Sequence, residues 1–126
     1  ETASLEEAPL VAGLYLNRLN KGMALQADPT LIFALGDPSI RRVLDVHKEI
    51  DSPYNTYKHA GLPPGPIRFV DPRYVQSVLH PASHSFLYMC AEPGGAGKHA
   101  FASSYREHLR NARAYQSWLN QQRIFR

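Results

Sequence analysis

The sequence lacks several features that would assign a protein to a class. Its 126 residues include one cysteine, so no internal disulfide can form. No apolar run approaches the roughly 20 residues that a membrane span needs. The chain opens with Glu1-Thr2-Ala3 and without methionine, so we expect a piece of a longer protein. Its 44% hydrophobic and 20% charged residues are typical of one globular domain with a modest core.

Patterns for metals and cofactors are also scarce. His80 and His84 are four residues apart, but Pro81 breaks the helix that would place them on one face, and His99 lies in a predicted strand. A pyridoxal phosphate enzyme would need a Schiff-base lysine and a phosphate cradle. The lysines lie in polar turns or loops or at their edges, and no cradle motif is present. We therefore expect neither a metal nor a cofactor.

Acidic residues are rare towards the C-terminus, although the net charge of the chain is only +3. From residue 106 onwards Glu107 is the single acidic residue, against Arg106, Arg110, Arg113, Arg123 and Arg126. A solvated helix face is the simplest interpretation, and a polyanionic partner is the alternative. No base-reading motif or aromatic interleaving supports nucleic acid, so we expect no nucleic-acid partner.

Cap and breaker residues predict the secondary structure. Asp28 as N-cap with Pro29 at N1 predicts a short apolar helix that ends at Gly36. Asp71-Pro72 repeats this signal for a helix to about residue 79.

A first helix, with a capping box over residues 4–7 and a proline at its start, should stop at Lys21-Gly22. Residues 85–91 and 98–102 predict paired strands, followed by an amphipathic helix over about residues 103–121. The sequence therefore predicts an α+β fold with several helices and a small antiparallel sheet, in a single domain over residues 1–126.

Residues 61–67 (Gly-Leu-Pro-Pro-Gly-Pro-Ile) predict a stiff, extended loop, because proline fixes φ and removes a donor. Two tyrosines and Asn55 precede it at residues 54–57. Such a loop loses little entropy when a ligand orders it, so it suits a preformed groove for a polar, ring-shaped ligand. Gln26, Asn55 and Tyr57 can bond hydroxyl and N-acetyl groups, although each could equally stabilise a loop.

Several blocks together resemble one family. They are residues 17–19 (Asn-Arg-Leu), 22–30 (Gly-Met-Ala-Leu-Gln-Ala-Asp-Pro-Thr), 54–57 and 61–67, with later blocks at 81–82, 87–88 and 99–101. In this order they are similar to the YceG-like (MltG) family of endolytic murein transglycosylases, some members of which have been labelled aminodeoxychorismate lyase. The resemblance covers about residues 1–108, and it implies a truncated catalytic domain.

The resemblance implies non-hydrolytic cleavage of the MurNAc–GlcNAc bond within peptidoglycan glycan strands, leaving 1,6-anhydromuramyl ends. One carboxylic acid would protonate the leaving oxygen and then assist the C6 hydroxyl of the sugar. By resemblance that acid is Glu1, one of two nearby glutamates in the family pattern. The other would lie upstream, so the resemblance leaves open whether the fragment is active. The implied substrate-binding residues are Gln26, Asp28, Asn55, Tyr57, Pro64 and Gly65.

The resemblance also implies a cellular location and partners for the protein. Family members are anchored to the inner membrane by one N-terminal helix, with the catalytic domain on the periplasmic side, and could work with the cell-wall synthesis machinery. The alternative function is a non-catalytic peptidoglycan-binding module or scaffold, since the same polar residues and stiff loop would serve it.

Overall fold

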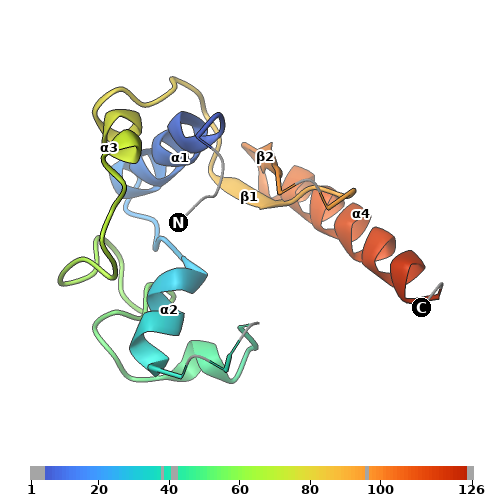
Figure 1. Cartoon of the computed structure of the whole chain (residues 1–126), viewed down its shortest axis with the longest axis horizontal. Coiled ribbons are helices and arrows are strands. Elements are labelled where there is room, and N and C mark those ends of the chain that lie inside the picture. Colours follow the sequence, from blue (N-terminus) through green and yellow to red (C-terminus); the bar gives the residue numbers. More distant parts are fainter. Residues whose placement is uncertain (1–4, 38, 41–42, 96, 125–126) are drawn as a thin grey trace. The chain divides into compact units, whose positions relative to one another are not determined.

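The computed structural model describes residues 5–37, 39–40, 43–95 and 97–124, without the side chains of residues 123 and 124 (Figure 1). The elements confirm the α+β fold class. In chain order they are α1 (Ala8–Asn20), α2 (Asp28–Leu35), the short 3-10 helix η1 (His47–Glu49), α3 (Pro72–Leu79), β1 (Tyr88–Ala91), β2 (His99–Ala102) and α4 (Tyr105–Ile124). None of the described helices is long and apolar enough to cross a membrane.

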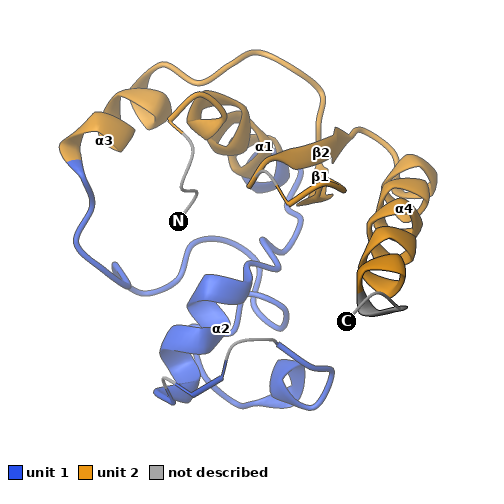
Figure 2. Cartoon of the chain, turned by 45° about the vertical axis from the view of Figure 1, so that its right-hand side comes forward, with its two compact units in different colours: residues 1, 18–71 blue, residues 2–17, 72–126 orange. Residues whose placement is uncertain are grey.

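The chain forms two compact units (Figure 2). Unit 1 comprises residues 18–71, with the last turn of α1, α2 and η1. In unit 2, residues 5–17 and 72–124 form the rest of α1, α3, the β1–β2 hairpin and α4.

In unit 1, the two ends of helix α2 can be compared with the start and stop that the sequence predicts. Gly36 takes the left-handed conformation (φ 64°) and its N–H bonds the Ile32 carbonyl, which confirms the predicted stop. The prediction that Asp28 is the N-cap is wrong: the N-cap is Ala27, in extended conformation, and Asp28 is the first helical residue. The Asp28 carboxylate is instead bonded by the Tyr57 hydroxyl, so the helix begins without a side-chain cap.

In unit 2, the predicted hairpin is confirmed. β1 and β2 pair in antiparallel register, with Tyr88 opposite Ala102 and Ala91 opposite His99. α4 packs against both strands, and the Tyr88 ring stacks on His108 with centroids 5.2 Å apart. The hairpin and α4 therefore share an aromatic interface.

Helix α1 lies against the segment that leads into β1. The Asn17 side-chain amide donates to the carbonyls of His84 (2.9 Å) and Phe86 (3.0 Å). A Cβ on Gly13 would come within 2.5 Å of the Ala82 carbonyl oxygen. Only glycine fits this approach, so the helix and the segment are in backbone contact here.

Glu7 joins the start of α1 to β2. Its side chain is buried (7% exposed) and accepts hydrogen bonds from the His99 backbone N–H at 2.9 Å and from His99 Nδ1 at 3.0 Å. Burial acts to raise the pKa of Glu7, but these bonds and the nearby charge of Lys98 hold it below its ordinary value. The sequence placed Glu7 in a capping box with Ser4, which lies outside the described residues.

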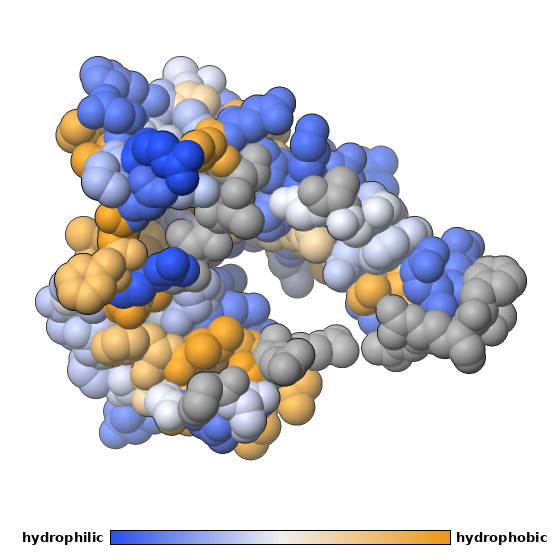
Figure 3. All heavy atoms as spheres, in the orientation of Figure 1, coloured by the Kyte–Doolittle hydropathy of each residue, from blue (hydrophilic) through white to orange (hydrophobic). Residues whose placement is uncertain are grey.

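The apolar core of the described residues is small. The buried hydrophobic residues are Ala8, Leu14, Leu25, Leu31 and Ala102. Larger apolar side chains stay exposed, among them Phe33 and Val46 in unit 1 and Val78 and Leu79 on α3. Figure 3 shows such apolar surface, in orange, over the part of unit 1 around α2. Polar side-chain contacts therefore carry much of the packing in each unit.

Replacing Glu7 by Gln should destabilise the chain by about 1–3 kcal/mol at neutral pH, because the two His99 donors lose a buried, charged acceptor. The pKa of Glu7 is lowered in the folded state. Its stabilisation is therefore full above the unfolded value of about 4.3 and is lost as pH falls through the folded pKa. Urea unfolding from pH 7 to pH 3 should show a flatter acid limb for Glu7→Gln. The exposed neighbour Glu6→Gln is the control, and an equal effect of both variants would contradict this account.

Candidate functional site

The loop at residues 50–59 is organised around the Asn55 side chain, which is fully buried. Its amide donates to the carbonyls of Lys48 (3.0 Å) and Ile50 (2.9 Å), while its Oδ1 accepts the backbone N–H of Tyr57 (3.0 Å). Both donors and the acceptor thus serve the backbone of the same loop. Asn55 shapes the site from within, and a direct substrate contact would require this loop to open.

Thr56 joins this loop to the start of α2. Its Oγ1 accepts the Ala27 N–H at 2.9 Å and lies 2.8 Å from the Thr30 hydroxyl, which itself donates to the Ala27 carbonyl. The Gln26 N–H donates to the Thr56 carbonyl at 3.1 Å. Both threonine side chains are buried. Residues 26–28 and 55–57 therefore form one hydrogen-bonded block, although they are about 30 positions apart in sequence.

This block presents three polar side chains, Gln26, Asp28 and Tyr57, which we call the polar cluster. The Tyr57 hydroxyl donates to the Asp28 carboxylate, and the Lys48 ammonium lies 5.0 Å from the Tyr57 ring centroid. Gln26 and Asp28 are exposed, and Gln26 has a left-handed backbone (φ 51°), which is uncommon for a residue with a side chain. The cluster offers an acceptor carboxylate, an amide and an aromatic face to solvent.

The stiff loop at residues 61–67 runs past an aromatic pair. Tyr54 packs on Phe33 with ring centroids 4.8 Å apart, and a Cβ on Gly65 would lie 3.2 Å from the Tyr54 hydroxyl. Pro64 is exposed. Gly65 therefore lies close to the Tyr54 side chain within unit 1, as a preformed wall requires.

The structure thus brings three of the predicted binding residues together in the polar cluster and places Asn55 beneath them. Glu1, the predicted acid, lies outside the described residues. Sequence reasoning missed Thr30 and Thr56 as the residues that hold the block together. Thr30 also bonds locally to the carbonyl of the N-cap Ala27, but neither threonine carries a sequence signal of the bond between them, although both fall inside the blocks that carry the family resemblance.

Other reactive groups are absent from the cluster. No group of three or more metal-ligating side chains occurs among the residues that the structure describes. Burial raises the pKa of the Cys90 thiol, a half-buried group in β1, so that it stays protonated and is a poor nucleophile. The chemistry of the described site is therefore hydrogen bonding and aromatic contact, which suits the recognition of a sugar.

Comparison with known proteins identifies the family of this chain. The sequence model of the YceG-like family matches residues 1–114. The chain belongs to the YceG-like family. It is 40% identical over 111 residues to a Bacillus subtilis protein named endolytic murein transglycosylase, and 34% identical over 115 residues to one of the same name from Streptococcus pneumoniae. The family resemblance expected from the sequence blocks is confirmed.

A solved structure supports the fold of this family member. A yceG-like protein of Listeria monocytogenes superposes with a TM-score of 0.74 at 39% identity, over 79% of this chain and 32% of that one. The two named relatives are each matched over 88% of this chain but over only 30% and 21% of their own lengths. The chain thus corresponds to less than a third of the proteins that carry the name.

Replacing Asn55 by Ala should lower the free energy of unfolding by about 2–3 kcal/mol, because two buried carbonyls and one N–H lose their partner. The effect should fall on unit 1: amide hydrogen exchange should speed up at residues 50–59 and stay unchanged in the β1–β2 hairpin. The exposed Asn120→Ala on α4 is the matched control. A stability unchanged by Asn55→Ala would exclude the central role of this amide.

Proposed function

We propose that this chain is the substrate-binding part of a murein transglycosylase, an enzyme that cuts the glycan strands of peptidoglycan. The observation that carries the proposal is the hydrogen-bonded block that presents Gln26, Asp28 and Tyr57 together. It is supported by the 40% identity to a protein named for this activity. Within this proposal the bond cut is MurNAc–GlcNAc, inside the strand, and the product ends are 1,6-anhydromuramyl groups.

The residues divide between contact and support. Gln26, Asp28 and Tyr57 bind hydroxyl and N-acetyl groups of the strand, and the aromatic face of Tyr57 suits the apolar face of a sugar ring. In this proposal the stiff loop with Pro64 and Gly65 lies along one side of the bound strand. Asn55, being buried, positions the loop instead of touching the sugar.

The proton transfer is assigned to Glu1. Hydrolases usually need two carboxyl groups, one on each face of the sugar. Here the C6 hydroxyl of the muramyl residue is the nucleophile, so one carboxyl can donate a proton to the leaving oxygen and then accept one from that hydroxyl. The bond from C1 to the leaving oxygen breaks as the bond from C1 to O6 forms, and no water is consumed. Asp28 is engaged by Tyr57 and serves as a binding residue.

The setting of the enzyme belongs to the proposal as well. It rests on the family resemblance alone: a longer protein, anchored by one helix in the inner membrane, with this part on the periplasmic side and the cell-wall synthesis machinery as a possible neighbour.

Product analysis tests the activity. The full-length protein should convert purified glycan strands to anhydro-ended fragments, and mass spectrometry should show no oxygen incorporated from ¹⁸O-labelled water. Glu1→Gln should slow cleavage at least about 100-fold, as expected for loss of a general acid, with unchanged thermal stability. Normal cleavage by this variant would overturn the assignment of Glu1. Strands that are bound but never cut by the wild type would favour the non-catalytic binding module.

A second variant tests the polar cluster. Tyr57→Phe removes the hydroxyl that holds Asp28 but keeps the ring. Loss of one hydrogen bond to a charged group should raise KM for strands about threefold to tenfold and leave the folding stability within about 0.5 kcal/mol. Tyr74→Phe on α3 is the control, with no expected change in KM. If both variants cleave strands with wild-type KM, the polar cluster does not bind the substrate.

A further inference from the structure

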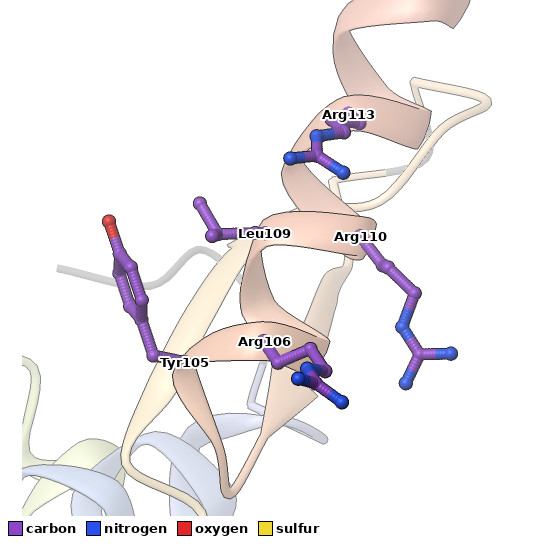
Figure 4. Close-up of a pocket in the computed structure, with 5 residues that line it drawn as sticks. All are labelled: Tyr105, Arg106, Leu109, Arg110 and Arg113. Atoms are coloured by element: carbon purple, nitrogen blue, oxygen red, sulfur yellow. The ribbon is translucent and has the colours of Figure 1, made fainter.

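Helix α4 carries a basic face that the proposed site does not use. Its members are Tyr105, Arg106, Leu109, Arg110 and Arg113, which line a hollow of about 580 Å³ (Figure 4). At about 100° per residue, the five fall within an arc of about 140°. Tyr105 and Leu109 lie on one side of this arc and Arg110 on the other, with Arg106 and Arg113 between them. We call these five residues the arginine face.

The arginine face has no described acidic partner. No carboxylate among the described residues is within ion-pair distance of Arg106, Arg110 or Arg113. Glu107, the single acidic residue of α4, lies three residues before Arg110, but the two side chains do not form an ion pair. All three arginines are exposed. Their positive charges are therefore not balanced within the described part of the chain.

The arginines also contribute little to the packing of unit 2. α4 contacts the hairpin through aromatic side chains. The rings of His108 and Tyr105 lie 5.2 Å and 5.7 Å from the ring of Tyr88, and Trp118 lies 3.3 Å from the position of a Cβ on Gly95. An arginine stripe that serves neither packing nor internal ion pairs is free to bind an external anion.

The make-up of the arginine face favours one kind of ligand. Guanidinium groups bind carboxylates and phosphates in a bidentate manner, while Tyr105, which is 59% exposed, and Leu109 add an apolar edge to the hollow that suits a ligand with apolar parts. A ligand with several carboxylates and apolar parts between them matches both features, as an acidic peptide does. A membrane surface would call for a broad apolar face, and the arginine face has only one aliphatic residue.

We propose that the arginine face binds the acidic stem peptides that project from the murein strand. This inference rests on the proposed function, because it assigns a second contact to the same polymer. Stem peptides recur along the strand, so binding at α4 needs no fixed spacing between α4 and the polar cluster. The arginine face would thus select peptide-bearing strands over strands stripped of their peptides.

The test compares two polymers that differ only in their peptides. Soluble strands with stem peptides, and the same strands after amidase treatment, are titrated against the full-length protein by fluorescence anisotropy at low salt. The wild type should bind the peptide-bearing strands about tenfold more tightly, and added salt should reduce this preference. Replacing Arg106, Arg110 and Arg113 together by Gln should abolish the preference and leave binding of stripped strands unchanged.

Two controls separate a specific effect of the arginine face from a general effect of net charge. Replacing Lys21, Arg73 and Lys98 by Gln removes the same charge from exposed sites elsewhere and should keep the preference. Peptide-bearing strands whose carboxyl groups have been amidated should bind like stripped strands. The proposal fails if the triple arginine variant keeps the preference. It also fails if polyphosphate, DNA or phosphatidylglycerol vesicles compete at the arginine face as well as the strands do.

Failure of the inference is distinguishable from failure of the proposed function. If the wild type and the triple arginine variant cut both strands at equal rates, the proposed enzymatic activity is supported and the arginine face is not a peptide site. If no strand is cut but the peptide preference disappears in the triple variant, peptide binding by the arginine face is supported and the proposed activity is wrong.

Discussion

The requirement to satisfy buried polar groups governs this structure more than apolar area does. Among the described residues, the largest fully buried side chains are Leu14, Leu31, Asn55 and Thr56, of which two are polar. Leaving such groups unpaired would cost about 1–3 kcal/mol each, which is a large part of the stability of a small domain. The hydrogen bonds of Asn55 and Thr56 therefore fix the geometry of unit 1, and unit 2 uses Glu7 and Asn17 in the same way.

This arrangement links the interior of unit 1 directly to its surface. Asn55 and Tyr57 are two residues apart, so the buried amide that accepts the Tyr57 N–H also sets the position of the half-buried Tyr57 ring. Thr56 does the same for the residues that flank Asp28. A surface built on such a base is preorganised, because its side chains are held by bonds within the chain. The family blocks therefore combine groups that contact solvent with groups that only hold them.

Much of the fold could be predicted because its signals are local. The left-handed Gly36, the proline at the start of α3 and the glycine-rich turn between β1 and β2 each act within a few residues. The misses are contacts over long separations. Asp28 has the residue type of an N-cap, but a tyrosine 29 positions away engages its carboxylate.

The candidate site was predictable in its membership but not in the role of each member. Asn55 has the chemistry of a sugar-binding residue, and its burial depends on where the carbonyls of Lys48 and Ile50 come to lie. The sequence pattern around Glu7 predicts a helix cap, but its partner His99 lies 92 residues further along the chain. No local pattern specifies where that strand lies relative to α1, so this contact could not be predicted. Residue type therefore indicates what a side chain can bond, while the tertiary fold decides which partner it meets.

The two hydrogen bonds from the Asn17 side chain to backbone carbonyls have a consequence for the chemical ageing of the molecule. An amide can donate to both the His84 and Phe86 oxygens only because it carries two N–H groups. Slow deamidation would convert it to an aspartate of almost the same shape with no donor at all. The product would set a carboxylate against two carbonyl oxygens and turn the seam between α1 and the segment before β1 from attraction to repulsion. Hydrolysis of a single side chain would thus loosen unit 2 without any change to the genetic sequence.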